Sequence, residues 1–349
     1  MEPTLGRVMA DEIAEQPATI EATVRRLRPL AAEIRALVGS RRRVLLIARG
    51  TSANAALYGR YLLALRADVL ATPATPSVST VYQSGLDLSD TVAVAVSQSG
   101  GTQEIVQAMH DAARCGARTV AVTNVADSPL ALGADLALVT AAGAEVAVPA
   151  TKTYTAQLVA MAVLALAVGR GQRLLDQLDD VPESVSRMLD SAEAATALAA
   201  ELRDVDRLVV TARGLALTTA RELALKLQEA CHVAAIGLSA ADLQHGPIAM
   251  LDAHTPVLLV ASGSDTAVAE GMVQTARLCR RSGAGVHVIG GDAALAAFAG
   301  TRLPGPDLPP ELAPIPLIVP GQLLTLALAR AKGLDPDTPR GLNKVTQTA

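Results

Sequence analysis

The sequence predicts an α/β protein of two tandem, doubly wound, three-layer domains with parallel sheets, preceded by N-terminal helices and followed by a C-terminal tail. Its 349 residues exceed the usual size of a single domain. Short apolar runs alternate with helix-length segments, which is the pattern of a parallel sheet covered by helices. Residues also recur at a constant spacing of 164 positions, which indicates two copies of one α/β unit: Ala48-Arg49-Gly50 with Ala212-Arg213-Gly214, and Thr91, Val96 and Thr102 with Thr255, Val260 and Thr266.

The first half of the chain is expected to hold a helical segment and then the first domain. Residues 1–38 are assigned to the helical segment, because apolar residues recur at helical spacing from residue 7 to residue 38, with Pro17 as a break. Residues 39–190 are assigned to the first domain, with a helix at 103–115 and a long apolar helix at 151–168. Its expected strands are 43–47, 69–72, 93–96, 119–123 and 136–139.

The second half is expected to repeat this arrangement and to end in a tail. Residues 174–200 are more polar and helical, and they are expected to carry the chain from one half to the other. Residues 191–332 are assigned to the second domain, and the polar, loop-like residues 333–349 to a C-terminal tail. The expected strands of the second domain include 207–210, 257–260 and 286–289.

The composition argues against several kinds of partner. Aromatic residues make up only 1% of the chain, whereas surfaces that stack nucleic-acid bases depend on exposed rings. The net charge of −4 gives no attraction to nucleic acid or to an anionic membrane. Three widely spaced cysteines without a paired motif indicate a reduced, cytoplasmic setting. We expect no signal peptide, because Glu2 and Asp11 are acidic, and no membrane span, because the longest apolar run, 158–168, is too short.

A turn rich in hydroxyls and glycines, Ser97-Gln98-Ser99-Gly100-Gly101-Thr102, connects an expected strand to an expected helix. Hydroxyls and backbone N–H groups at a helix N-terminus bind anions, so we interpret the turn as a phosphate site. The alternative is a capped helix N-terminus with surplus hydroxyls. The matching turn of the second copy, Ser262-Gly263-Ser264-Asp265-Thr266, keeps only part of the pattern.

A second strand-to-helix turn, Gly50-Thr51-Ser52, is expected at the same edge of the first sheet. Ligands of doubly wound folds bind outside the carboxyl ends of the strands, so the two turns can converge on one ligand. We expect Thr51 or Ser52 to cap the helix that follows.

Three charged residues, Glu222, Lys226 and Glu229, share one face of an expected helix, because they stand at i, i+4 and i+7. One interpretation is a solvated ladder of ion pairs. The other is a general base tuned by a lysine between two carboxylates in a cleft, and the spacing alone does not decide between them.

His245 stands in an expected turn, Asp242-Leu243-Gln244-His245-Gly246-Pro247, where it can be structural or catalytic. The histidines and cysteines show no spacing suited to a metal site. The chain also carries no dinucleotide-binding glycine motif after a strand, no Walker lysine loop and no nucleophile elbow. We therefore expect no metal and no cofactor.

Taken together, several of these motifs resemble those of the double-SIS (sugar isomerase) family. This family includes the isomerase half of glutamine–fructose-6-phosphate amidotransferase and, with a closer likeness, the SIS-type glucosamine-6-phosphate deaminases. The resemblance covers nearly the whole chain and implies flavodoxin-like SIS domains. It rests on Met9-Ala10-Asp11-Glu12-Ile13, Glu15-Gln16-Pro17, Ala48-Arg49-Gly50-Thr51-Ser52, Ser97-Gln98-Ser99-Gly100, Ala150-Thr151-Lys152-Thr153, Ala224-Leu225-Lys226-Leu227-Gln228-Glu229, Leu243-Gln244-His245-Gly246-Pro247, Gly333-Leu334-Asp335-Pro336-Asp337 and Leu342-Asn343-Lys344-Val345-Thr346.

The resemblance implies a sugar-phosphate substrate and a role for each matching residue. Glu229 would move a proton between C1 and C2 of the sugar, and Lys226, next to Glu222, would assist through its charge. His245 would open the sugar ring from a neighbouring subunit, so a homodimer is implied. Lys344, beside Asn343 in a tail that closes the site, corresponds to the lysine that forms a Schiff base with fructose 6-phosphate in the amidotransferase. The residues expected to bind the substrate or its phosphate, or to lie near it, are Gly50, Thr51, Ser52, Ser97, Gln98, Ser99, Thr102, Val148, Thr151, Glu222 and Asn343.

The expected reaction is isomerising deamination, in which glucosamine 6-phosphate and water give fructose 6-phosphate and ammonia. Glutamine hydrolysis is not expected, because the chain begins at the sugar half with Glu2. The chain departs from the amidotransferase at Arg49 and Gly101, where that enzyme has Cys and Glu, and from the deaminase pattern at Asn54-Ala55. Three alternatives stay open: an isomerase or deglycase for another sugar phosphate, ammonia-dependent amination of fructose 6-phosphate, and a non-catalytic phosphosugar sensor.

Overall fold

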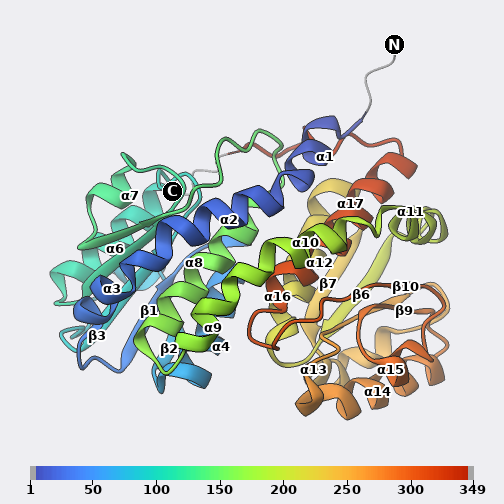
Figure 1. The fold of residues 1–349 in the computed structure, drawn as a ribbon. Helices are drawn as coiled ribbons and strands as arrows, with labels where there is room; N and C mark the ends of the chain where they lie inside the picture. The colour runs from blue at the N-terminus through green and yellow to red at the C-terminus, as the bar shows by residue number, and fades with distance from the viewer. Residues whose placement is uncertain (1–4, 345–349) are drawn as a thin grey trace. The chain divides into compact units, whose positions relative to one another are not determined.

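A computed structural model describes residues 5–344 of the chain, so Val345, Thr346 and the rest of the expected tail lie outside the described residues. The described chain divides into two compact units, each with its own sheet (Figure 1). The first-sheet unit comprises residues 18–145 and 152–179. The second-sheet unit comprises residues 5–17, 146–151 and 180–344.

The first sheet has five parallel strands in the order β2-β1-β3-β4-β5. The sequence predicted all five, with boundaries within two residues of those observed. The central strands are buried along almost their whole length, as expected for a sheet covered on both faces. The strands are β1 (Arg43–Ile47), β2 (Leu70–Pro73), β3 (Thr91–Val96), β4 (Arg118–Thr123) and β5 (Leu136–Val139).

The second sheet also has five parallel strands, in the order β10-β9-β8-β6-β7. Strands β7 and β10 were not predicted from the sequence. Strand β7 is partly exposed and interrupted by Gly237, and β10 has only two residues, so neither forms a continuous apolar run. The strands are β6 (Arg207–Ala212), β7 (Ala234–Ser239), β8 (Val257–Ala261), β9 (Val286–Gly290) and β10 (Arg302–Leu303).

Counted within each unit, both sheets have the strand order 2-1-3-4-5, which confirms the prediction of two doubly wound α/β copies. The backbone repeats as well. Arg49 and Arg213 have φ, ψ of −133°, 160° and −131°, 151°, and Gly50 and Gly214, which follow them, both have positive φ, 52° and 65°. The spacing of 164 residues therefore relates equivalent positions in three dimensions.

Helices cover both faces of the first sheet. The long helices α4 and α8 pack together on one face, and every residue of α8 from Lys152 to Ala167 is buried. The other face carries α6 and two helices of only four residues, α5 and α7. The helices of this part of the chain are α2 (Gln16–Leu27), η1 (Arg28–Leu30), α3 (Ala31–Val38), α4 (Gly50–Ala67), α5 (Ser77–Thr80), α6 (Gln103–Arg114), α7 (Pro129–Leu132), α8 (Lys152–Val168), α9 (Gln172–Asp176) and η2 (Gln177–Asp180).

In the second-sheet unit, α12 packs on strands β6 to β8 and on α17. The stretch Pro314–Ala331 is long and apolar enough to cross a membrane by length and composition, but 78% of it is buried within the protein, as in a core helix. The helices are α1 (Arg7–Ala14), α10 (Val181–Leu189), α11 (Ala192–Glu201), η3 (Gly214–Ala216), α12 (Leu217–Cys231), α13 (Ala240–Gln244), η4 (Pro247–Met250), α14 (Thr266–Arg281), α15 (Ala293–Ala296), α16 (Pro314–Leu317) and α17 (Val319–Ala331).

The described part of the tail is held against the beginning of the chain. The Asp337 carboxylate accepts hydrogen bonds from the backbone N–H groups of Val8 (2.9 Å) and Met9 (2.7 Å) in the first turn of α1. Asp335 accepts from the N–H of Gly6 at 3.0 Å. Carboxylates at a helix N-terminus satisfy N–H groups that have no partner within the helix, and they interact favourably with its dipole.

Replacing Asp337 with alanine is expected to loosen α1. The substitution removes both acceptors of the first turn, so the free energy of unfolding should fall by about 1–2 kcal/mol. Hydrogen exchange at the amides of Val8 and Met9 should become faster. Asp204→Ala, at an exposed position of the same unit, is the control. Unchanged exchange at residues 8 and 9 would show that the tail does not hold α1.

Candidate functional site

The first sheet brings the two predicted turns together. Strands β1 and β3 are parallel neighbours, with Ile47 opposite Ala95. The connection after β1 leads to β2 on one side of the sheet, and the connection after β3 leads to β4 on the other side. The carboxyl ends of β1 and β3 therefore form the switch point at which doubly wound folds bind ligands. The turns Gly50–Ser52 and Ser97–Thr102 directly follow these strand ends.

An ion pair that the sequence analysis missed links the two turns. Arg49, at the N-cap of α4, donates from Nε and Nη2 to the two carboxylate oxygens of Glu104, at 3.0 and 2.8 Å. Glu104 lies in the first turn of α6, and only 13% of its side chain is exposed. This contact raises the pKa of the Arg49 guanidinium, which stays charged. The position equivalent to Glu104 in the second copy is Val268, so a comparison of the two copies distinguishes Glu104 but does not identify its partner.

The predicted cap of α4 is wrong. Arg49 is the N-cap and makes no side-chain capping bond, while Thr51 and Ser52 lie inside the first turn. Ser52 Oγ instead accepts a hydrogen bond from Nε2 of Gln157 in α8, at 3.1 Å. The helix begins at Gly50, which has a positive φ, and therefore starts two or three residues earlier than a cap at Thr51 or Ser52 would place it. Apart from its chain neighbours and the backbone of its own helix turn, no atom of the described residues lies within 4 Å of the place where a Gly50 Cβ would be, so this backbone is open to approach.

The loop Ser97–Thr102 is a turn in which the hydroxyls of Ser97 and Thr102 make no hydrogen bond to the described residues. Thr102 is the N-cap of α6, but its side chain does not cap the helix, so the capped-helix alternative does not describe this turn. Within residues 5–344, no side chain or backbone group bonds to the hydroxyl of Ser97 or Thr102, and Ser99 Oγ accepts only from the N–H of Gly101, at 3.3 Å. The first turn of α6 thus offers hydroxyls and N–H groups to an anion.

Gly100 fixes the shape of this loop. Its φ is 62°, and a Cβ there would lie 2.2 Å from Ser128 Oγ and 2.8 Å from Thr123 Oγ1. The loop is also tied to β4, because the carbonyl of Gln98 accepts from the N–H of Asn124 at 3.0 Å.

In the second copy, the hydroxyls of the equivalent turn are hydrogen-bonded within the protein. The hydroxyls of Ser262 and Ser264 bond to each other at 2.8 Å, and Ser264 donates to the carbonyl of Leu308 at 2.6 Å. The space that is open above Gly50 is occupied above Gly214, where a Cβ would lie 3.5 Å from Asp265 Oδ2. Burial raises the pKa of Asp265. These contacts explain why only the first copy presents hydroxyls.

Helix α12 carries a charged cluster of Glu222, Lys226 and Glu229, and most of it is buried. Lys226 Nζ lies 3.4 Å from Glu222 Oε1 and 2.5 Å from Glu229 Oε2. The side chains of Lys226 and Glu222 are 1% and 0% exposed, so the cluster is not a solvated ladder. Glu229 is 23% exposed and is the member that solvent reaches. Glu222 is the buried partner of Lys226, and its role as a substrate-binding residue stays a prediction.

His245 is an exposed residue at the C-terminus of α13, so it is not a histidine of the core. The segment that follows it begins with Gly246, whose φ is 130°. Among residues 5–344, no group of three or more His, Cys, Asp or Glu side chains is placed to hold a metal ion.

The tail brings Lys344 to the segment that precedes α8. Lys344 Nζ donates to the carbonyl of Ala147 at 2.6 Å, and the N–H of Val148 donates to the carbonyl of Asp337 at 3.1 Å. Asn343 is exposed. Thr151 is fully buried, and its carbonyl accepts from Nε2 of Gln322 in α17 at 3.3 Å. The predicted residues 148 and 344 are thus neighbours within the second-sheet unit.

The SIS domain model matches residues 37–167 and 201–295 of the chain. The chain is 35% identical over 347 residues to a glutamine–fructose-6-phosphate aminotransferase (isomerizing) of Thermococcus kodakarensis, with 96% of this chain and 57% of that protein covered. It therefore spans little more than half the length of this relative.

Two solved structures share the fold. The C-terminal domain of the glucosamine-fructose-6-phosphate aminotransferase from Francisella tularensis aligns with a TM-score of 0.86 and 22% identity, covering 96% of this chain and 99% of that one. The glucosamine-6-phosphate deaminase from Thermotoga maritima aligns with a TM-score of 0.78 and 22% identity, covering 98% and 100%.

Gly100→Ala is expected to lower the free energy of unfolding by about 2–4 kcal/mol, because it adds backbone strain and a clash with Ser128. Gly101→Ala is the matched control, since its Cβ would meet only Ser99 Oγ, at 3.9 Å. Urea denaturation of both variants measures the difference. Equal stability of the two would contradict the described loop geometry.

Lys226→Met is expected to lower the free energy of unfolding by about 3–5 kcal/mol, because Glu222 would keep a buried charge without its cation. Arg221→Met, at an exposed position of the same helix, should change stability by less than about 0.5 kcal/mol. If thermal and urea denaturation show similar small effects for both variants, the buried charge cluster is not maintained in solution.

Proposed function

The chain belongs to the SIS domain family, and from this membership we propose that it is a phosphosugar isomerase acting on an amino-sugar phosphate. The proposed reaction is the conversion of glucosamine 6-phosphate and water into fructose 6-phosphate and ammonia. The relatives described above are named for fructose 6-phosphate or glucosamine 6-phosphate.

One observation carries the proposal: the charge cluster of α12 is not required by the fold. The residues at the equivalent positions of the first copy are Tyr58, Leu62 and Leu65. Tyr58 and Leu62 are fully buried in α4, so the same helix position is stably filled by uncharged side chains. Burying charges is costly unless they are paired, and such clusters concentrate at functional sites.

Within this proposal, Glu229 is the base. It is the solvent-accessible carboxylate of the cluster, and it moves the proton from C2 to C1 once the sugar ring is open. The ammonium of Lys226, at 2.5 Å, stabilises the negative charge that develops along this path. The resulting imine at C2 then takes up water and releases ammonia. His245 as the ring-opening residue of a neighbouring subunit, and Lys344 as a Schiff-base lysine, stay predictions.

The hydroxyls of the Ser97–Thr102 loop are proposed to bind the phosphate. Phosphate oxygens would accept from the hydroxyls of Ser97 and Thr102 and from N–H groups at the N-terminus of α6. Arg49 holds Glu104, so the carboxylate nearest the loop is neutralised by an ion pair.

The test of the reaction is the release of ammonia and fructose 6-phosphate from glucosamine 6-phosphate. The purified protein should release both in equal amounts, and Glu229→Gln should lower kcat by about 10²–10⁴-fold. Glu193→Gln, at an exposed position of α11, is the control and should keep full activity. A Glu229→Gln variant with a near-normal rate would exclude this mechanism. Binding of the sugar phosphate without turnover would favour a sensor or another phosphosugar.

The phosphate loop belongs to a different unit from α12, so it is tested by its own variant. Thr102→Val removes one hydroxyl and keeps the shape of the side chain. It should raise KM for the sugar phosphate by about tenfold and leave the stability of the protein unchanged, because this hydroxyl makes no hydrogen bond to any of the residues 5–344. Calorimetric titration with the sugar phosphate measures the same loss of affinity. Unchanged affinity would remove Thr102 from the phosphate site.

A further inference from the structure

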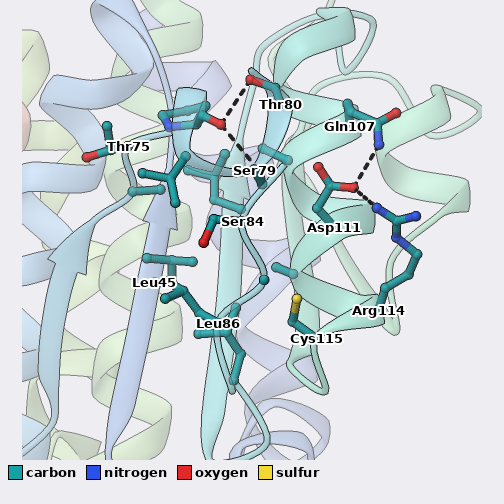
Figure 2. Close-up of a pocket in the computed structure, with 18 of the residues that line it drawn as sticks. Leu45, Thr75, Ser79, Thr80, Ser84, Leu86, Gln107, Asp111, Arg114 and Cys115 are labelled. Carbon is teal, nitrogen blue, oxygen red and sulfur yellow. Dashed lines mark hydrogen bonds and ion pairs between the residues drawn. The ribbon is translucent and has the colours of Figure 1, made fainter. Parts of the chain in front are cut away.

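The first-sheet unit contains a cavity of about 630 Å³ beside the phosphate loop's helix. It lies between strand β1, the short helix α5 and helix α6, and Figure 2 shows the side chains that line it. The chain crosses from β2 to β3 over this face, where a doubly wound fold normally places a full helix. Here the crossing contains only the four residues of α5, followed by residues 81–90 without a helix.

In the second copy, apolar side chains fill the place that corresponds to this cavity. At the spacing of 164 residues, Ser79 of α5 corresponds to Leu243 of α13, and Ala108 of α6 to Met272 of α14. Leu243 and Met272 are both 0% exposed and belong to one apolar cluster with Val209 of β6. In the first copy, Ser79 and Ala108 line the cavity, together with Leu45, the counterpart of Val209. The cavity therefore arises from smaller side chains at positions that the fold can fill.

One wall of the cavity carries a buried carboxylate. Asp111 of α6 is 5% exposed, and its Oδ1 accepts from Gln107 Nε2 at 2.8 Å and from Arg114 Nη2 at 2.5 Å. Figure 2 shows both donors on the same side of the carboxylate. Among residues 5–344, no donor reaches Oδ2.

The fold does not require this charge. The counterpart of Asp111 is Thr275, whose Oγ1 accepts from Nε2 of Gln244 in α13 at 3.1 Å. In the second copy the covering helix thus satisfies the polar group at this position. In the first copy, a charged group stands at the same place beside a cavity, and the covering segment supplies no donor to it.

The geometry points to a second ligand site, which takes a small molecule with an apolar body and an amino group. The volume lies within the range of ligand pockets, and the floor of Leu45, Ile47 and Ala112 suits an apolar body. An ammonium or amine N–H would donate to Asp111 Oδ2 in a charge-assisted hydrogen bond. Anions are disfavoured, because Arg114, the cation of the lining, is already paired with Asp111 and largely exposed. This inference is independent of the proposed reaction.

The test uses N-phenyl-1-naphthylamine, whose fluorescence rises in apolar cavities, and a pair of competitors. Phenethylamine and 3-phenylpropanoate have similar apolar bodies and opposite charges. The wild-type protein should bind the probe, and phenethylamine should displace it at a concentration about tenfold or more below that of 3-phenylpropanoate.

Two variants test the volume of the cavity and the charge of its carboxylate independently. Ser79→Leu copies Leu243 of the second copy, so it should fill the cavity and abolish probe binding. Asp111→Asn keeps the volume and should retain probe binding while removing most of the preference for the amine. Ala113→Leu, at an exposed position of α6, is the control for a leucine added to the surface. Circular dichroism and thermal denaturation establish that each variant is folded.

Each outcome decides the question. The site is supported if the wild-type protein binds the probe and prefers the amine, if Asp111→Asn loses the preference, and if Ser79→Leu loses probe binding. Equal displacement by both competitors, or an unchanged preference in Asp111→Asn, overturns the assignment of an amine. If the wild-type protein does not bind the probe, or if Ser79→Leu binds it as well as Ala113→Leu does, the cavity is not a ligand site. Should Ser79→Leu fail to fold, Ala112→Leu is the second filling variant.

Discussion

The direction of the chain at the centre of each sheet is the constraint on which the rest of the structure depends. Parallel strands joined by right-handed crossovers place all carboxyl ends at one edge, and the change of direction between the first and third strands opens a crevice there. In the first sheet, this constraint brings Gly50 and the Ser97–Thr102 loop together across neighbouring strands. The Arg49–Glu104 ion pair then fixes the two turns to each other.

Because the α/β unit is duplicated, equivalent positions of the two copies can be compared within one molecule. Each copy shows which side chains the fold accepts at a position, so a departure in one copy identifies a requirement other than folding. The hydroxyls of the 97–102 loop are uncommitted in one copy and bonded internally in the other. Lys226 stands where the first copy has Leu62, and Asp111 stands where the second copy has Thr275. In the proposed function, the hydroxyls that bind the phosphate belong to the first copy, and the acid–base groups belong to the second.

Much of the fold could be predicted from the sequence, because its central strands are continuous apolar runs and its copies share a constant spacing. Strands β7 and β10 could not, since a partly exposed strand with Gly237 and a strand of two residues leave no apolar pattern. For the site, the grouping of Glu222, Lys226 and Glu229 followed from helical spacing, but their burial did not, because α17 packs on α12 only in the folded unit. The cap at Thr51 or Ser52 was wrong because Gly50, with its positive φ, begins the helix before either hydroxyl.

The anchoring of α1 by Asp335 and Asp337 has a consequence for the order of folding. The second-sheet unit is assembled from three separate stretches of sequence, 5–17, 146–151 and 180–344, and the first-sheet unit is inserted between them. During synthesis, residues 18–145 and 152–179 can collapse around their own sheet while α1 still lacks the carboxylates that hold its first turn. The first turn of α1 therefore gains these acceptors only after more than 300 further residues have been made.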